Sequence, residues 1–333
     1  MRLTNLNKIF WTIILLTIAC QSWSAVKVEK ITYGEYGQCY SLSNDNVRVV
    51  VTADVGPRVI CYQMFGGQNV FSEMDPSVST RNDKDWHIYG GHRFSHAPEA
   101  LPRTYTPDNT PVKVEVVSTD AVKFTPDLEK QNGIQRELLV RLDESGTGVE
   151  VTHTLTNMGR WEIELAPWAL TVVKPGGEAW IPNEPFVSQG DNLLPARNMA
   201  IWGYTDLGDS RWTFGTKYIR LKCDAKRPTA QKIGIENKQG WVGYLNDGIL
   251  FVNRFGYRPD KTYTDRSSNC EFYTAGNFME IESLGYLHKL DIGKSATHIE
   301  RWYLFTNVKA AKSDNDLEKT IAPLLEKTKA VEF

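Results

Sequence analysis

The sequence has little net charge and no long apolar segment. Its 38 Lys and Arg residues are set against 40 Asp and Glu, which leaves a formal net charge of −2 at pH 7. Nucleic acids and anionic membranes are bound through an excess of basic residues, so this balance argues against both as partners. The longest apolar run, residues 9–19, is shorter than a membrane-spanning helix requires. We therefore expect no transmembrane segment in the mature chain.

Cysteine is also scarce, with five residues in the chain. The absence of CxxC pairs and of Cys/His ligand spacing argues against structural zinc. If Cys20 is removed with a signal peptide, Cys39, Cys61, Cys223 and Cys270 remain. This even number permits two disulfides in an oxidising compartment, and three pairings are open.

Residues 1–25 have the pattern of a secretory signal peptide. Basic residues precede the apolar run, and small residues follow it, with cleavage expected after Ser24 or Ala25. The preceding Thr-Ile-Ala-Cys resembles a lipobox, so a lipid anchor at Cys20 is the alternative. The sequence thus predicts an exported protein, periplasmic or secreted, in which residues 26–333 form one domain of about 310 residues.

Helical periodicity is almost absent, whereas apolar and polar residues alternate along much of the chain. This period of two is typical of half-buried strands. The C-terminal segment 317–325 is the exception, and Pro323 should kink or shorten its helix. No repeat or low-complexity linker divides the chain, so we predict an all-β, single-domain sandwich with a short C-terminal helix. The clearest predicted strands are 112–116, 149–155, 219–223 and 279–282.

Three of the six histidines lie close together around the stretch YGGHRFSHAPE, residues 89–99. His87, His96 and Glu99 could supply metal ligands, since imidazole and carboxylate both bind divalent ions. Their spacing matches no ligand motif, so no cofactor is expected, and a divalent ion held by this loop is the less favoured reading. His92 and Arg93 suit proton exchange and anion binding instead. A surface loop with structural hydrogen bonds is the plain alternative.

Five longer segments carry a family resemblance. In their order and spacing they resemble a bacterial family of uncharacterised domains on the galactose-mutarotase-like β-supersandwich, itself distantly similar to aldose 1-epimerases. The resemblance covers nearly the whole mature chain and implies a sugar cleft on one face of a large antiparallel sheet. The segments are DVGPRVICYQMFGGQNVF (54–71), 89–99, TYTPDNTPV (104–112), 155–182 and 278–304.

The resemblance also implies site residues. In aldose 1-epimerases a Glu removes the anomeric hydroxyl proton while a His protonates the ring oxygen. Glu282 matches the Glu best, and Glu280, two residues earlier, should share its face of the strand. Trp168 falls where the His is expected, and an indole cannot donate a proton as imidazolium does. His92 and Arg93 align with the first sugar-binding loop and are expected in the cleft.

Further substrate-binding candidates follow from the same segments, with Arg58 as a second anion contact. His153 lies on an apolar strand face and is expected to be a core residue. These further candidates are Arg58, His96, Glu99, Tyr105 and Asp108.

The leading hypothesis from the sequence is an exported carbohydrate-active enzyme that performs β-elimination on uronate-containing oligosaccharides, as a lyase or a dehydratase. His92 would be the acid or base, Arg93 or Arg58 would bind the carboxylate, and Trp168 or Tyr105 would pack on the sugar ring. The alternatives are an aldose 1-epimerase, a non-catalytic carbohydrate-binding protein and, more distantly, a glycoside hydrolase.

Overall fold

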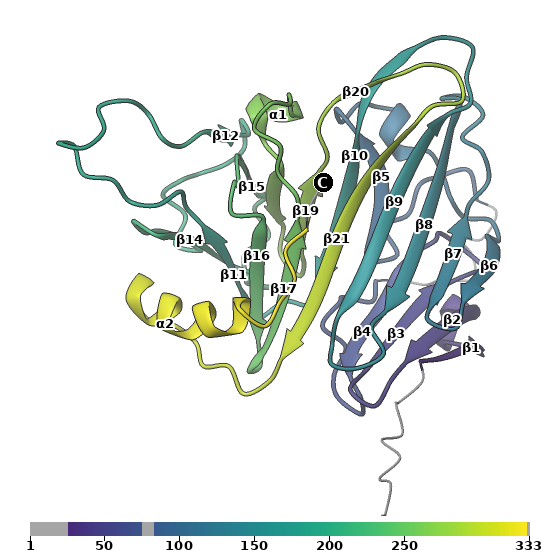
Figure 1. Cartoon of the computed structure of the whole chain (residues 1–333), viewed down its shortest axis with the longest axis horizontal. Coiled ribbons are helices and arrows are strands. Elements are labelled where there is room, and N and C mark those ends of the chain that lie inside the picture. The colour runs from purple at the N-terminus through teal and green to yellow at the C-terminus, as the bar shows by residue number, and fades with distance from the viewer. Residues whose placement is uncertain (1–25, 75–82, 332–333) are drawn as a thin grey trace, which may run out of the picture.

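Two large antiparallel sheets pack face to face in the structure, a computed structural model that describes residues 26–74 and 83–331 (Figure 1). The predicted signal peptide, with Cys20, lies outside the described residues. None of the helices in the described ranges has the length and apolar character needed to cross a membrane.

The first sheet contains eleven strands, and β20 pairs with β10 off the main path. Its centre is formed by β5, β10 and β19, which come from three distant parts of the chain. In spatial order its strands are β1 (Lys27–Thr32), β2 (Gln38–Ser43), β3 (Val47–Thr52), β4 (Val59–Met64), β5 (His92–Ala97), β10 (Ile163–Val173), β19 (Met279–Leu284), β18 (Cys270–Thr274), β15 (Gln231–Ile235) and β12 (Met199–Ile201), with β20 (His288–Leu290) beside β10.

The second sheet contains ten strands and covers one face of the first (Figure 1). In spatial order they are β13 (Trp212–Phe214), β14 (Tyr218–Lys222), β11 (Glu178–Pro182), β16 (Trp241–Asn246), β17 (Ile249–Phe255), β21 (Ser295–Phe305), β9 (Val149–Asn157), β8 (Ile134–Leu142), β7 (Ala121–Thr125) and β6 (Lys113–Ser118).

The main apolar core lies between the two sheets and draws on both. In β9 every second residue is buried, as the alternation predicts, because the inward face packs on the first sheet. The prediction fails at the edge strand β6, where Val116 is 54% exposed. The all-β sandwich predicted from the sequence is confirmed.

The predicted C-terminal helix is present as α2 (Asp314–Leu325). Ser313 caps its N-terminus by accepting a hydrogen bond from the Asp316 amide. Leu317 and Ile321 bury against Trp180 of the second sheet. The helix ends two residues after Pro323, in line with the expected shortening. Smaller helical turns are η1 (Gly34–Tyr36), η3 (Arg103–Tyr105) and α1 (Thr264–Ser267).

The two disulfides that the even number of cysteines permits do not form among the described cysteines. Cys39, Cys61, Cys223 and Cys270 are all buried, on separate strands or strand ends, and no disulfide joins any two of them. They act as small apolar core residues.

Gly90 and Gly91 are required by close packing of the backbone rather than by a ligand. Both have positive φ, at 84° and 64°. A Cβ on Gly91 would lie 2.4 Å from the Val59 carbonyl oxygen, and one on Gly90 would lie 2.1 Å from that of Ser72. These glycines therefore allow the chain to enter β5 tightly against β4.

A chain of hydrogen bonds crosses the core from one sheet to the other. His153 Nδ1 is 3.0 Å from the His298 carbonyl oxygen, which can only accept, so this nitrogen carries the proton. His153 Nε2 must then accept from His92 Nε2 at 2.7 Å. His92 Nδ1 in turn accepts from the Thr171 hydroxyl at 2.9 Å. Neutral histidines satisfy every bond in this relay.

A second group beside the relay surrounds Glu300. Its carboxylate accepts from Ser283 at 2.6 Å, Asn253 at 2.7 Å and Trp302 at 2.9 Å. Ser283 is also 2.6 Å from His298 Nε2. These contacts bind β19 of the first sheet to β17 and β21 of the second.

These core histidines make the fold sensitive to acid. Burial lowers the pKa of His153 to about 3 and that of His298 to about 4, and it also lowers the pKa of His92. The unfolded chain binds protons below about pH 6.5 while the folded chain does not, so stability falls as the pH drops from there toward these lower values. Each histidine should remove about 1.4 kcal/mol per pH unit.

We expect His298→Gln, whose amide can still donate to Ser283, to reduce this slope by about 1.4 kcal/mol per pH unit. Urea unfolding at pH 7.5, 6.5 and 5.5 measures the slope for both proteins. The same pH dependence of the unfolding free energy in both proteins would show that folding does not lower the pKa of His298.

A second prediction concerns Gly91. We expect Gly91→Ala to destabilise the fold by more than about 2 kcal/mol, because the new methyl meets backbone atoms on β4. Gly293→Ala is the matched control, since Gly293 has φ of 77° and nothing lies within 4 Å of its added Cβ. Equal losses in thermal unfolding would mean that the backbone conformation alone, and not the contact, requires Gly91.

Candidate functional site

A pocket of about 370 Å³ opens on the face of the first sheet that is turned away from the second. Met279 and Ile281 of β19 point into the core, so Glu280 and Glu282 point to this outer face. Register pairs Glu282 with Leu170 of β10, and Leu170 with Arg93 of β5. We call this cavity the Glu280 pocket; it is lined by Trp86, Ile88, Arg93, Glu99, Tyr105, Trp168, Tyr204, Ala230, Lys232, Tyr273 and Glu280.

Arg93 and Glu280 form a loose ion pair at the base of the pocket. Arg93 Nη2 lies 3.5 Å from Glu280 Oε1, and Arg93 Nε is buried without a hydrogen-bond partner. Burial raises the pKa of the Glu280 carboxyl; Arg93 opposes the rise, and the neighbouring Glu282 adds to it. Glu280 therefore exchanges its proton at higher pH than an ordinary Glu.

Lys232 is held between two buried carboxyl groups. Its Nζ lies 2.8 Å from Glu271 Oε2 and 3.1 Å from Glu282 Oε2. Burial lowers the pKa of Lys232, but these carboxyl groups outweigh it and raise the pKa well above the usual range. Burial and Glu282 raise the pKa of Glu271. The contacts with these two carboxyl groups thus hold Lys232 as an ammonium.

Aromatic and cationic side chains alternate along the pocket. The Arg93 guanidinium lies 5.0 Å from the centre of the Trp86 ring and 5.8 Å from that of Trp168. Lys232 Nζ lies 5.3 Å from Trp168 and 4.8 Å from Trp202. Each cation is thus fixed between two indole faces, which stabilise positive charge.

Trp168 cannot act as a proton donor to a ligand. Its indole N–H donates to Glu282 Oε2 at 2.8 Å, and its ring faces are taken up by the two cations. Glu282 itself is fully buried and accepts from both Trp168 and Lys232. Glu280, and not Glu282, is the carboxyl presented to the cavity.

The structure brings half of the ten sequence-predicted site residues together around the cavity and leaves Glu282 directly behind it. The other four lie elsewhere in the fold. The pocket-lining residues are Arg93, Glu99, Tyr105, Trp168 and Glu280; those outside are His92, Arg58, His96 and Asp108.

His92 is a correction to the expected cleft. It is adjacent to Arg93 in β5, and neighbouring strand residues point to opposite faces. His92 therefore points between the sheets, where it contacts Thr171 and His153. With zero exposure it cannot touch a ligand in the Glu280 pocket.

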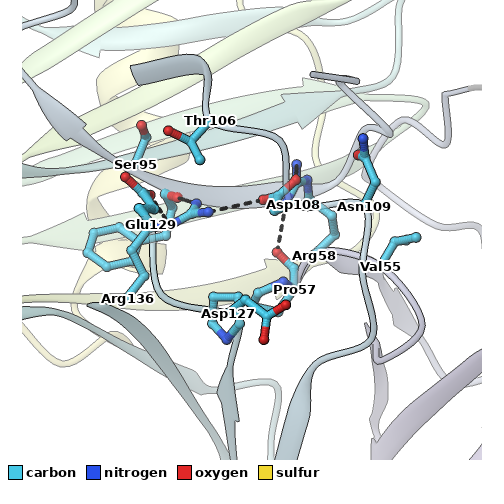
Figure 2. A network of polar contacts seen from close by, with 12 residues as sticks. Val55, Pro57, Arg58, Ser95, Thr106, Asp108, Asn109, Asp127, Glu129 and Arg136 are labelled. Carbon is cyan, nitrogen blue, oxygen red and sulfur yellow. Dashed lines mark hydrogen bonds and ion pairs between the residues drawn. The ribbon is translucent and has the colours of Figure 1, made fainter. Parts of the chain in front are cut away.

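Arg58, Asp108 and His96 are a second correction, because they belong to a buried charge network and do not line the pocket. Figure 2 shows Arg58, Asp108, Glu129 and Arg136 of this network. Arg58 donates two hydrogen bonds to the Asp108 carboxylate, at 2.7 and 2.9 Å. Arg136 lies 3.4 Å from Asp108 and 2.7 Å from Glu129. His96 Nε2 joins the network through Glu129 at 3.0 Å. Arg58 is buried and bonds to Asp108 and to the Pro57 carbonyl, so it does not contact an anionic ligand in the pocket.

The histidine-rich stretch does not form a metal set. His87 pairs with Asp83, whereas His96 lies in the charge network and Glu99 accepts from Tyr105 at the pocket. The separate residues His92, His153 and Glu300 place ligand atoms within 4.8 Å of one another.

That trio fits a hydrogen-bonded relay better than an ion. Tetrahedral zinc holds two imidazole nitrogens roughly 3.3 Å apart, given Zn–N bonds of about 2.0–2.1 Å. His92 Nε2 and His153 Nε2 are 2.7 Å apart, the length of a hydrogen bond.

Sequence reasoning missed Lys232, Glu271, Trp86, Tyr204 and Tyr273. The one available signal is Lys232, a lone cation within the apolar strand QKIGI at 231–235. Its role depends on the pairing of β15 with β18, which places it beside Tyr273 and near Glu271. No local spacing reveals that pairing.

No protein-family model matches the chain, and no curated protein matches it in sequence. Solved structures do resemble it. A galactose mutarotase-like protein from Clostridium acetobutylicum matches with a TM-score of 0.55 and 11% identity over 85% of this chain and 99% of that one. A galactose mutarotase-like protein from Lactobacillus casei matches with a TM-score of 0.52 and 10% identity, over 80% of this chain and 100% of that one.

A TPR-domain containing protein from Parabacteroides distasonis matches with a TM-score of 0.56 and 13% identity, over 82% of this chain. This chain spans 48% of that protein's length. At such identities the likeness concerns the fold alone. The chain has the galactose mutarotase-like fold, as its sequence segments predicted.

Proposed function

We propose that the protein is a carbohydrate-active enzyme that exchanges protons with a sugar in the Glu280 pocket, and that ring opening of an aldose is the reaction this pocket suits best. The observation that carries the proposal is a carboxyl of raised pKa, Glu280, facing the same aromatic-walled cavity as the fixed ammonium of Lys232. The fold, shared with mutarotase-like proteins, is consistent with it.

The two groups divide the chemistry of mutarotation between them. The Glu280 carboxylate takes the proton of the anomeric hydroxyl, and the bond between the anomeric carbon and the ring oxygen breaks. The bond's electron pair passes to the ring oxygen, whose developing negative charge the fixed Lys232 ammonium stabilises while a water molecule supplies the proton. Closure on the other face of the carbonyl returns both protons and gives the other anomer. Lys232 thus supplies, beside the ring oxygen, a positive charge that the indole of Trp168 cannot provide.

The charge around the cavity favours a neutral sugar. Glu99 and Glu280 line the pocket and Glu271 and Glu282 lie behind it, against the cations Arg93 and Lys232. A uronate carboxylate would meet four carboxyl groups and two cations that are already paired. The rings of Tyr204 and Tyr273, which also line the pocket, instead suit the apolar C–H faces of a sugar ring.

β-Elimination on a uronate-containing oligosaccharide, by an exported enzyme, is the second candidate. The Arg93 guanidinium favours it, because its Nε is buried without a partner and its planar fork fits a carboxylate. Glu280 would have to be the base in place of His92. A sugar-binding protein without catalysis is the third reading of the same pocket.

We expect the purified protein to speed the interconversion of freshly dissolved aldose anomers, and Glu280→Gln to lower that rate by about 10²–10⁴-fold, the usual contribution of a positioned base. Polarimetry or NMR of a panel of single anomers measures the exchange. Glu137→Gln, a partly exposed change on β8, is the control for folding and charge. Full activity in Glu280→Gln would show that Glu280 is not the catalytic base.

The same panel separates the candidates. New ultraviolet absorbance from an unsaturated uronate would replace the epimerase by an eliminating enzyme. Saturable binding of an unchanged sugar would leave a binding protein.

The pH profile gives an independent test. Arg93 lowers the pKa of Glu280 against burial, so Arg93→Gln should raise it further. A reaction that needs the Glu280 carboxylate loses activity in acid, and the midpoint of that loss should move to higher pH in the variant. The pH dependence of kcat/KM reports the free enzyme and measures this shift. Arg258→Gln, which affects a surface pair with Asp260, should leave the midpoint in place.

A further inference from the structure

One wall of the Glu280 pocket is a short segment, residues 98–106, that we call the pocket wall. It carries Glu99 and Tyr105, and the Tyr105 hydroxyl donates to the Glu99 carboxylate. The Tyr105 ring meets Trp86 edge-on, with ring centres 5.2 Å apart. The position of the pocket wall therefore sets where the Glu99 carboxylate and the rings of Tyr105 and Trp86 contact a ligand.

Arg103 anchors the wall to the inside of the fold. Its Nη1 donates to His96 Nδ1 at 2.6 Å, and its other amino group donates to the Pro98 carbonyl. The Arg103 carbonyl accepts from Asn132 Nδ2 at 2.9 Å. The guanidinium thus links the wall to the strand beneath it.

The contact with Arg103 determines which nitrogen of His96 carries the proton. A guanidinium only donates, so Nδ1 offers its lone pair and Nε2 carries the hydrogen, which it donates to Glu129. Glu129 is fixed in turn by Arg136 at 2.7 Å and Asn132 at 2.7 Å. Neutral His96 is therefore a polar bridge between the wall and the charge network that Figure 2 shows.

We propose that His96 is a positioning residue, whose neutral imidazole holds the pocket wall in place and whose protonation releases it. The consequence for a ligand rests on the function proposed above, whereas the contact itself does not. His96 lies on the inner face of β5, so it touches no ligand and acts through Arg103.

Protonation breaks the bridge because it puts a second hydrogen between two donors. The new Nδ1–H would point at the Arg103 guanidinium, 2.6 Å away. The charged groups that face His96 in the described structure are Glu129, which favours the proton, and Arg103 and Arg136, which oppose it. Burial is the largest effect and lowers the pKa of His96. The bridge is thus intact at neutral pH and opens in acid.

The test compares two substitutions. His96→Gln keeps a donor for Glu129 and an acceptor for Arg103 but cannot be protonated, whereas His96→Leu removes both. His288→Gln is the matched control, because His288 stacks on Tyr286 away from the wall.

Hydrogen exchange of residues 98–106, measured against the core strand β9, needs no substrate. In the wild type we expect the amides of the pocket wall to exchange about tenfold faster in acid, after correction for the intrinsic effect of pH on exchange. This factor corresponds to the loss of one charge-assisted hydrogen bond. His96→Gln should remain protected, His96→Leu should exchange rapidly at all pH values, and His288→Gln should follow the wild type.

Sugar kinetics extend the test to the pocket. His96→Leu should raise KM about tenfold, from loss of the same hydrogen bond, with little change in kcat, since Glu280 and Lys232 are untouched. Equal acid dependence of wall exchange in the wild type and His96→Gln, or a protected wall in His96→Leu, would overturn the proposal. If hydrogen exchange follows these expectations but the protein has no activity on any sugar, the proposed function is wrong and the positioning role of His96 still holds.

Discussion

The three central strands of the first sheet carry polar side chains on both faces, and the rest of the structure depends on how these side chains are paired. On the inner face of β5 and β10, His92 and Thr171 enter the relay to the second sheet. On the outer face, Arg93 and Trp168 form the pocket. A buried polar group without a partner costs about 1–3 kcal/mol, so such strands are stable only when each face supplies its own hydrogen bonds.

The polar contacts on the two faces of the first sheet have different roles. The bonds of the inner histidine relay join neutral groups in one direction, which fixes the sheets against each other without adding buried charge at the relay. The outer contacts hold charge in excess, with several carboxyl groups around Arg93 and Lys232. Perturbed carboxyl groups gathered in a cavity are typical of functional sites, whereas a saturated relay is typical of a structural one.

Strand alternation, chain order and family-like segments were enough to predict the sandwich, its short helix, and Glu280 with Glu282 on one face. The same rule applied to GGHR would have separated His92 from Arg93, but two glycines made the stretch resemble a loop. Arg58 and Asp108 illustrate another limit: they are 50 positions apart, and only the folded chain shows that each satisfies the other. Lys232 becomes part of the site through strand pairing, which no short pattern encodes.

Trp168, Lys232 and Glu282 are best understood as one unit rather than as three replacements. Glu282 is fully buried, and its Oε2 accepts from both the indole and the ammonium and so holds these groups in place. A carboxylate so engaged and fully buried is poorly suited to take a proton from a sugar. The role of base then passes to Glu280, one pleat away on the same face and open to the cavity. The presence of an indole where an imidazole was expected thus changes the part that each neighbouring carboxyl can play.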